Sequence, residues 1–277
     1  EIDILLLQEI DVDSKRSAYI DEVQYILDRT HFNYGVFASM WQAQVIPSDG
    51  LGRVNTGNAI LSRWELSDSE RIQLDLMTDQ EAIVQYFYLR RNIIKAKVEV
   101  PGKEPFYAVN THLTAFASDD TKKKHVEKYI STLDDINNSG FKFVSGGDLN
   151  SLPPVNENEL IPDFCVSDAC EGEIFHNEID DGPHKSGSYF EYDSSENTWL
   201  EPLYENENYT PGINFDSRLD TIHYTHSPGT SLNLDRKLDY LFTNLVKLDG
   251  SENTLQEYKE ISDHVPVIMT VILSGED

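Results

Sequence analysis

The chain has 277 residues, of which 39% are hydrophobic and 10% aromatic, which is enough for the core of a large domain. No run approaches the roughly 20 consecutive apolar residues of a membrane span, so a helical membrane protein is not expected. With 22 basic and 49 acidic residues, the formal net charge of −27 argues against an extended nucleic-acid-binding surface, although a compact site that carries a divalent cation could still take a phosphate.

The first half of the chain is predicted to consist of strands with one helix between them. Residues 2–7 form an apolar run, typical of a buried strand, that ends at Gln8 and Glu9. Residues 17–30 place apolar side chains at helical spacing. Further runs rich in β-branched and aromatic residues predict strands at 32–38, 58–62, 82–89, 93–100 and 106–111.

The second half begins with a predicted helix over 118–136 and a strand over 141–145. Residues 153–234 are rich in Asn, Asp, Glu, Ser, Gly and Pro, which predicts a loop-rich insertion facing the substrate. Its two cysteines, Cys165 and Cys170, are too few for a zinc site, but one loop disulfide stays open. Two strands, 237–242 and 265–273, complete the prediction.

Many strands with few helices between them favour the α/β class, with two packed, mostly antiparallel sheets flanked by helices. We expect a single catalytic domain over residues 1–277. The chain starts within a strand-like run and shows no leader pattern, so the compartment cannot be inferred. We expect a soluble monomer, and the acidity leaves export open.

Polar residues cluster where the predicted apolar strands end, and such positions usually face a cleft. The segments are Gln8-Glu9, Gly57-Asn58, Asn110-Thr111-His112, Gly147-Asp148-Leu149-Asn150 and Asp263-His264, with Asp239 inside a further strand. Their combination is more specific than any one of them. We therefore expect one shared site.

Asp148 and Asn150 are two residues apart, so in an extended chain both side chains point to one face. A carboxylate there can deprotonate water, and the amide can orient that water or donate to a phosphoryl oxygen. The alternative is an Asx turn, which these residue types favour.

Glu9 and Asp263 offer hard oxygen ligands suited to Mg²⁺, and Mn²⁺ stays open as a substitute. His112 and His264 are candidates to donate to phosphoryl oxygens, where phosphoryl transfer concentrates charge. Asp239 could hold the His264 imidazole in one tautomer, as a carboxylate does in hydrolytic triads. The alternative for Asp239 is a structural ion pair with a neighbouring basic residue.

Three weaker patterns remain. Lys122-Lys123-Lys124-His125 could steer a polyanion, but three consecutive helical residues point three ways, so we favour a solvated helix turn. His223 and His226 have metal-ligand spacing without flanking ligands. Arg91 could form a bidentate phosphate contact, and Asn58 and Asn110 are further candidates for binding the substrate phosphate.

Together these segments resemble the endonuclease/exonuclease/phosphatase superfamily, which includes exonuclease III-like and deoxyribonuclease I-like nucleases, deadenylases, sphingomyelinases and inositol polyphosphate 5-phosphatases. The resemblance covers nearly the whole chain and rests on Leu7-Gln8-Glu9, the run from Gly57 to Arg63, Asn110-Thr111-His112-Leu113, Gly147-Asp148-Leu149-Asn150-Ser151, Leu238-Asp239-Tyr240 and Ser262-Asp263-His264.

The resemblance implies a four-layered α/β sandwich and a role for each matching residue. Glu9 would ligate Mg²⁺, Asp148 and Asn150 would activate water and bind phosphate, and His112 would contact the phosphate or leaving group. Asp239 would orient His264, and Asp263 would assist the metal or that histidine. Family members also carry a strand before the Gln-Glu segment that ends in a metal-region Asn, so this sequence would lack one ligand.

The branch of the superfamily stays open. The Trp-X-Gly-Asp-X-Asn run of the inositol 5-phosphatases is absent, since Ser145 stands two residues before Gly147. Our first hypothesis is a Mg²⁺-dependent phosphodiesterase acting on nucleic acid or nucleotides. The second is a sphingomyelinase-type enzyme or another phosphatase branch, which an exposed aromatic hairpin would support. The third is a catalytically silent binding domain.

Overall fold

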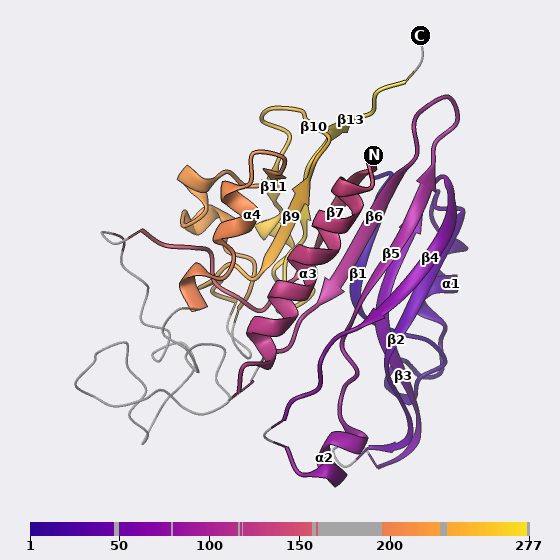
Figure 1. Ribbon diagram of the computed structural model, residues 1–277. Helices are drawn as coiled ribbons and strands as arrows, with labels where there is room; N and C mark the ends of the chain where they lie inside the picture. The colour runs from indigo at the N-terminus through magenta and orange to yellow at the C-terminus, as the bar shows by residue number, and fades with distance from the viewer. Residues whose placement is uncertain are drawn as a thin grey trace, which may run out of the picture. The chain divides into compact units, whose positions relative to one another are not determined.

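The computed structural model describes residues 1–46, 50–78, 80–115, 117, 119–156, 159, 196–227 and 232–275 (Figure 1). The chain divides into two compact units. The first comprises residues 1–113, 131–147 and 273–277, and the second comprises 114–130 and 148–272. The boundary falls within helix α3 (Thr121–Asn138) and at Asp148, the last residue of strand β7 (Lys142–Asp148).

The first unit contains two sheets. One has the order β1-β3-β2, and the strands of the other sheet that belong to this unit follow the order β4-β5-β6-β7. The strands are β1 (Ile4–Asp11), β2 (Tyr34–Ile46), β3 (Gly50–Ser62), β4 (Glu65–Gln73), β5 (Asn92–Glu99) and β6 (Phe106–His112). Strand β3 contacts β5 and β6, so the sheets pack face to face. The short helices are η1 (Lys15–Ser17), α1 (Glu22–Leu27) and α2 (Ala82–Phe87).

Strand β5 shows why this sequence makes a half-buried sheet. Ala96 and Val98 are fully buried, while Lys95 and Lys97, which alternate with them, reach the edge strand β4 and pair with Glu70 and Asp68, respectively. This alternation is the period of two expected of a strand with one face on the core. The turn at Pro101-Gly102 joins β5 to β6 as a hairpin.

Several sequence predictions in this unit differ from the structure. Residues 82–89, predicted as a strand, contain helix α2, whose apolar side chains are exposed rather than paired in a sheet. Strand β4 was missed because its sequence is polar, as is common for an edge strand with one open side. The predicted helix over 17–30 is shorter, since α1 begins after Asp21, whose carboxylate accepts from the Gln24 backbone N–H at 3.0 Å.

Strand β1 does not end at Leu7, as predicted, but continues to Asp11 through a bulge between Leu7 and Ile10. Glu9 lies in this bulge with a φ of 56°, which a non-glycine residue rarely adopts. A bulge turns a side chain away from the regular alternation of its strand. Glu9 is therefore presented by a bulge, not by a strand end.

Gly147 is required immediately before Asp148. Its φ is +135°, and a Cβ at this position would lie 1.9 Å from the Thr111 carbonyl oxygen on β6. Any larger residue would push β7 away from β6. The Gly-Asp pair is thus dictated by the close approach of these two backbones.

The second unit is built from short elements. They are η3 (Glu196–Thr198), α4 (Glu201–Glu205), β8 (Thr210–Pro211), η4 (Phe215–Ser217), η5 (Thr221–His223), β9 (Asp239–Thr243), β10 (Val246–Lys247), β11 (Asn253–Thr254), η6 (Gln256–Tyr258), β12 (Val267–Ile268) and β13 (Val271–Ile272). The pairs β8–β9, β10–β13 and β11–β12 are antiparallel. The strand predicted over 265–273 is therefore two short strands.

Most of the predicted insertion over 153–234, including Cys165 and Cys170, lies outside the described residues. The predicted α/β class, with two packed, mostly antiparallel sheets and helices, is confirmed. No helix in the described part of the chain is long and apolar enough to cross a membrane. The expectation of a single domain stays a prediction.

The start of α3 corrects the prediction of a solvated basic turn. Lys122 is 3% exposed and forms an ion pair with Glu196, and His125 is buried and accepts a hydrogen bond from the Thr114 backbone N–H. Burial lowers the pKa of Lys122, whereas the Glu196 carboxylate raises it. Only Lys124 of the three lysines is exposed.

This buried pair predicts a large stability effect. We expect Glu196→Gln to reduce the free energy of unfolding by about 3–5 kcal/mol, because it leaves the Lys122 ammonium buried without its counter-charge. Urea unfolding measures the effect. Glu205→Gln, at the exposed end of α4, is the control and should change stability by less than about 0.5 kcal/mol. Equal values for the two variants would contradict the prediction.

Candidate active site

Asp148 and Asn150 meet at the end of β7. Asp148 Oδ1 accepts from the Asn150 backbone N–H at 2.8 Å, and Asp148 Oδ2 lies 3.1 Å from Asn150 Nδ2. Asn150 has a φ of 47°, so the chain turns here instead of staying extended. The Asx turn and the shared site were weighed as alternatives, but here the turn itself brings the two side chains together.

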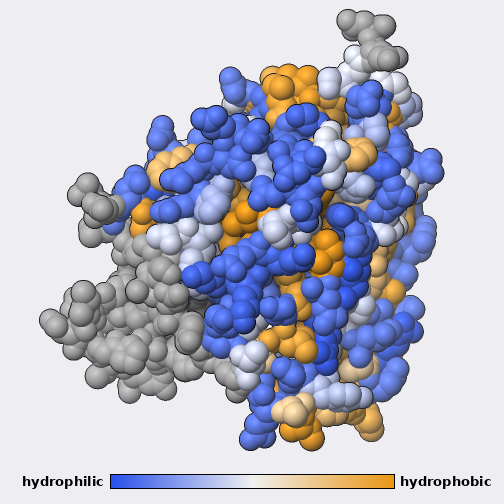
Figure 2. Space-filling view, viewed as in Figure 1, coloured by the Kyte–Doolittle hydropathy of each residue, from blue (hydrophilic) through white to orange (hydrophobic). Residues whose placement is uncertain are grey.

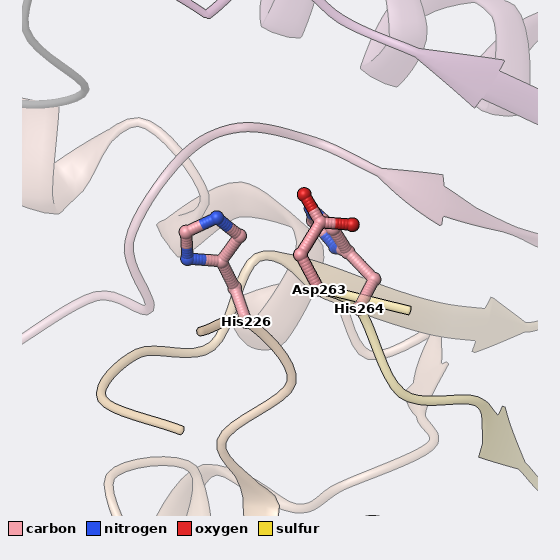
Figure 3. A group of neighbouring side chains, drawn as sticks. All are labelled: His226, Asp263 and His264. Atoms are coloured by element: carbon pink, nitrogen blue, oxygen red, sulfur yellow. The ribbon is translucent and has the colours of Figure 1, made fainter. Parts of the chain in front are cut away.

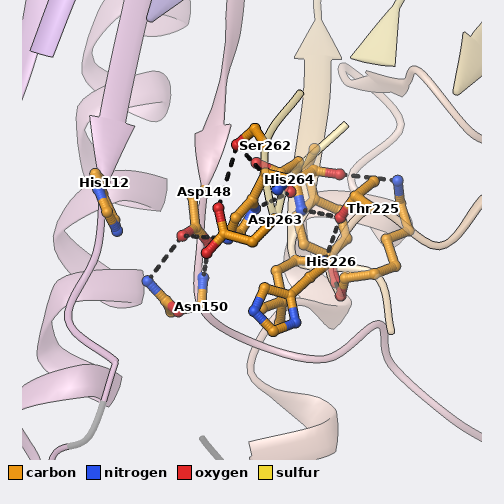
Figure 4. Close-up of polar contacts among 12 residues, drawn as sticks. His112, Asp148, Asn150, Thr225, His226, Ser262, Asp263 and His264 are labelled. Atoms are coloured by element: carbon orange, nitrogen blue, oxygen red, sulfur yellow. Dashed lines mark hydrogen bonds and ion pairs between the residues drawn. The ribbon is translucent and has the colours of Figure 1, made fainter. Parts of the chain in front are cut away.

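His264 lies between two carboxylates (Figure 4). Its Nδ1 is 2.8 Å from Asp239 Oδ2, and its Nε2 is 3.9 Å from Asp148 Oδ2. The predicted alternative for Asp239, an ion pair with a basic neighbour, is not formed: Lys237 Nζ donates to the Asp239 backbone oxygen, and Arg236 pairs with Asp235.

The backbone holds this arrangement in place. Thr225 Oγ1 accepts from the backbone N–H groups of Leu238 and Asp239 at 2.9 and 3.1 Å, which fixes the start of β9. The Thr225 carbonyl accepts from the Val265 N–H at 2.8 Å. Thr225 therefore ties the Asp239 segment to the His264 segment, a linking role that the sequence did not reveal.

The charges around His264 determine its protonation. Burial lowers the pKa of the imidazole, but the Asp239 carboxylate, with Asp148 and Asp263, outweighs burial and raises it to about 10. At neutral pH the ring is therefore an imidazolium whose Nδ1–H donates to Asp239. The Nε2–H remains directed to the Asp148 side, where it can donate to an anion.

This pKa predicts a pH-dependent stability. Because the folded value of about 10 lies above the ordinary value near 6.5, His264 contributes stability that is complete below pH 6.5 and is lost as pH rises through 10. In a chelating buffer, the difference in unfolding free energy between the wild type and His264→Gln should shrink from pH 6.5 to 10. A difference that is constant over this range would contradict the prediction.

His226 is a neighbour of this site that the sequence analysis ranked low. It is 3% exposed, and its ring centroid lies 4.8 Å from that of His264. Burial and the charge of His264 lower its pKa to about 4. His223, the other half of the predicted pair, instead lies 3.5 Å from Thr254 Oγ1. What places His226 at the site is its antiparallel bridge with His264, and the spacing of residues in the sequence does not reveal that bridge.

In the first unit, Glu9 and His112 are neighbours. Glu9 Oε1 lies 3.9 Å from His112 Nδ1, and Glu9 Oε2 lies 4.0 Å from Arg16 Nη2. The Glu9 side chain is 55% exposed, whereas that of His112 is 9% exposed. The Glu9 carboxylate is therefore open to a cation from solvent.

Asn110 holds the backbone next to Glu9 in place through hydrogen bonds. Its amide nitrogen donates to the carbonyls of Leu7 and Ala59 at 2.7 and 2.8 Å, and its amide oxygen accepts from Gln8 Nε2 at 2.6 Å. Both amide hydrogens are therefore used within the unit. Asn110 therefore holds the bulge that carries Glu9, and a direct phosphate contact by its side chain stays a prediction.

The other two predicted phosphate contacts are also buried in the first unit. Asn58 is fully buried and donates to the Asn92 carbonyl at 3.1 Å. Arg91 is 8% exposed, and its Nη1 lies 3.5 Å from the His112 carbonyl oxygen. The Asn58–Asn92 hydrogen bond links the two sheets of the unit, whereas Arg91 directly precedes β5 and His112 ends β6, the neighbouring strand of the same sheet. A direct phosphate contact by either side chain stays a prediction.

The available donors fit a hard divalent cation. Glu9 and Asp263 are exposed carboxylates, and Asp148 adds a carboxylate and Asn150 an amide oxygen in the second unit. Mg²⁺ prefers such oxygen ligands and keeps waters for exchange with substrate phosphate. That Glu9 and Asp263 ligate one ion stays a prediction.

One family model matches nearly the whole chain. The model described as Endonuclease/Exonuclease/phosphatase family matches residues 1–264. No curated protein matches the sequence. Among solved structures, the endonuclease/exonuclease/phosphatase from Beutenbergia cavernae DSM 12333 is 17% identical, with a TM-score of 0.61. The match covers 99% of this chain but 63% of that one, so this chain spans less than two thirds of its length.

Two further solved structures are similar along most of both chains. An AP endonuclease from Archaeoglobus fulgidus is 17% identical, covers 97% of this chain and 88% of its own, and has a TM-score of 0.54. A 3'-5' exonuclease from Neisseria meningitidis is 19% identical, covers 97% and 89%, and has a TM-score of 0.53. At these identities the likeness concerns the fold alone.

Proposed function

Because the chain belongs to the endonuclease/exonuclease/phosphatase family, whose members hydrolyse phosphate esters, we propose that it is a metal-dependent phosphodiesterase that uses an activated water. The observation that carries the proposal is His264, held by Asp239 on one side and facing Asp148 on the other. A cationic donor beside a carboxylate base is the pair of groups that phosphodiester hydrolysis needs.

In the proposed reaction, each side chain of the second unit has a separate role. Asp148 accepts a proton from water as the water oxygen bonds to phosphorus. The ester P–O bond then breaks, the leaving oxygen takes up a proton from solvent, and Asp148 later returns its proton to solvent. Nε2–H of His264 donates to a phosphoryl oxygen, where negative charge builds up, and Asp239 keeps that donor oriented. Asn150 Nδ2, 3.1 Å from Asp148 Oδ2, holds the base in place.

A bound Mg²⁺ would polarise the phosphate and lower the pKa of a nearby water. Glu9 and Asp263 are the residues proposed to hold it, and Mn²⁺ has the same oxygen preference. The proposed role of His112 is to contact the phosphate or the leaving group.

Nucleic acid or a nucleotide is the favoured substrate class. Two of the structural neighbours are named as an AP endonuclease and an exonuclease. The net charge of −27 disfavours a long nucleic-acid footprint, so we propose recognition of a short segment or a chain end.

The test is hydrolysis over a panel of single- and double-stranded nucleic acids, nucleotides, sphingomyelin, inositol phosphates and a simple diester. Each substrate is assayed with Mg²⁺, with Mn²⁺ and with chelator. We expect turnover of at least one phosphodiester that chelator abolishes and Mg²⁺ restores. No turnover of any substrate with either metal would overturn the proposal.

A second candidate, a sphingomyelinase-type lipid phosphodiesterase, is favoured by helix α2. Ile83 is 66% and Tyr86 72% exposed, and Val84 and Phe87 are exposed beside them. Figure 2, viewed as in Figure 1, shows apolar side chains on the surface at the bottom of the view, where Figure 1 labels α2. Isolated apolar residues on a surface are common, but several on one short helix can enter a lipid interface.

If α2 enters a lipid surface, Ile83→Ser combined with Tyr86→Ser should weaken binding to sphingomyelin and phosphatidylcholine vesicles by at least about 100-fold, since each buried apolar side chain contributes about 1.5–3 kcal/mol. Vesicle co-sedimentation measures this. Ile261→Ser, which changes an exposed isoleucine of the second unit, is the matched control. Equal binding by all three proteins would remove the lipid candidate.

A further inference from the structure

Two imidazoles and one carboxylate converge in the second unit. The possible ligand atoms of His226, Asp263 and His264 all lie within 4.8 Å of one another (Figure 3). His226 and His264 belong to segments that pair as an antiparallel bridge, and the Ser227 backbone N–H donates to the Asp263 carbonyl at 2.9 Å. The backbone therefore sets the three side chains side by side.

The donor set does not suit magnesium. Mg²⁺ takes oxygen ligands, whereas two nitrogens and one oxygen match borderline ions such as Zn²⁺ or Co²⁺. Zinc takes four ligands at about 2.0–2.2 Å from nitrogen and oxygen, so three protein ligands leave one position for water. The Asp263 side chain is exposed and can turn toward an ion with little cost.

The surroundings of His264 are those of a metal-bound histidine, which usually donates its other ring N–H to a carboxylate, and His226 has a carboxylate near Nδ1 beyond hydrogen-bond distance. His264 Nδ1 lies 2.8 Å from Asp239 Oδ2. His226 Nδ1 lies 4.0 Å from Asp235 Oδ1. In each ring the carboxylate stands at Nδ1, which leaves Nε2 as the ligand atom.

We infer that His226, Asp263 and His264 form a second cation site, selective for Zn²⁺-like ions over Mg²⁺, whose occupancy inhibits the enzyme. The inhibition part rests on the proposed function, because an ion on Nε2 of His264 replaces the proton that this atom would donate to a phosphoryl oxygen. It also engages Asp263. Zinc-like ions at this site therefore turn off hydrolysis.

The cluster can be tested without any substrate. The whole chain, kept in excess Mg²⁺, is titrated with Co²⁺, and the visible absorption of nitrogen-coordinated cobalt is followed. We expect one strong Co²⁺ site that Zn²⁺ displaces, and a loss of affinity of about 10-fold or more in His226→Gln. His223→Gln, three residues away and outside the cluster, is the matched control and should bind as the wild type does.

Because His226 is buried, Asp263→Asn provides a second variant at an exposed position, and circular dichroism checks that each variant is folded. It should weaken Co²⁺ binding as well. Wild-type affinity in both folded variants, or no cobalt absorption in the wild type, would overturn the inference.

The activity arm separates this inference from the proposed function. Each protein's hydrolysis is measured with and without micromolar Zn²⁺ and divided by its own zinc-free rate. Wild type and His223→Gln should be inhibited, and His226→Gln should keep its rate. Equal inhibition of all three overturns the inhibitory role. If nothing is hydrolysed, the proposed function fails, and the cobalt titration still decides whether the site exists.

Discussion

Asp148→Asn is expected to lower kcat/KM by about 10²–10⁴-fold on any phosphodiester that the protein hydrolyses, the range for loss of one general base. The substitution keeps the shape of the side chain and its ability to accept from the Asn150 backbone N–H at 2.8 Å. It removes the negative charge that takes the proton from water. The fold should therefore persist while the chemistry fails.

The measurement is steady-state kinetics in saturating Mg²⁺, with thermal unfolding of the same samples. Asp249→Asn, at an exposed turn position of the second unit, is the control and should keep full activity. If Asp148→Asn and Asp249→Asn both keep it, catalysis lies elsewhere. If the wild type binds substrate but hydrolyses none, the hypothesis of a silent binding domain gains support.

The polar segments of the site could be recognised in the sequence because the residues of each segment are close together along the chain. Asp148 and Asn150 are two residues apart, and Asp263 and His264 are adjacent, so their spacing carries information before any fold is known. The Asp239–His264 contact is not local, and it came from the resemblance and from the chemistry of carboxylate–histidine pairs. The structure adds the 2.8 Å distance.

Other features could not be predicted because they depend on partners far along the chain. His226 gains its place from a bridge to His264, 38 residues later. Lys122 can be buried because the Glu196 carboxylate neutralises its charge, and no local sequence pattern predicts that Glu196 is its partner. The bulge at Glu9 shows only in the register of β1 against β3.

Sequence patterns mispredict two kinds of element: an edge strand with a polar sequence and an exposed helix with an apolar sequence. Strand β4 has a polar sequence because one side is open, and α2 is rich in β-branched and aromatic residues yet is helical and exposed. Propensity is a weak prior that tertiary context overrides. Both errors fall outside the predicted site segments, so the site predictions did not depend on them.

A double-mutant cycle on Asp239 and His264 is expected to show that the two act as one group. His264→Gln should lower kcat by about 10²–10³-fold, the usual cost of losing one donor to a developing oxyanion. Asp239→Asn should cost a similar factor, because it removes the carboxylate that orients and charges the ring. The double variant should be no slower than His264→Gln alone, since Asp239 acts through His264.

The pH profile distinguishes this positioning role from a merely structural one. In the wild type, His264 stays protonated up to its pKa of about 10, so this group should not limit kcat/KM across the neutral range. Without the Asp239 charge the pKa of the ring falls, and the alkaline loss of activity should move to lower pH in Asp239→Asn. A structural role would lower the rate without moving that limb. If the rate losses of the two single variants were additive, and the alkaline limb of the Asp239→Asn profile stayed at the wild-type pH, Asp239 would not act through His264.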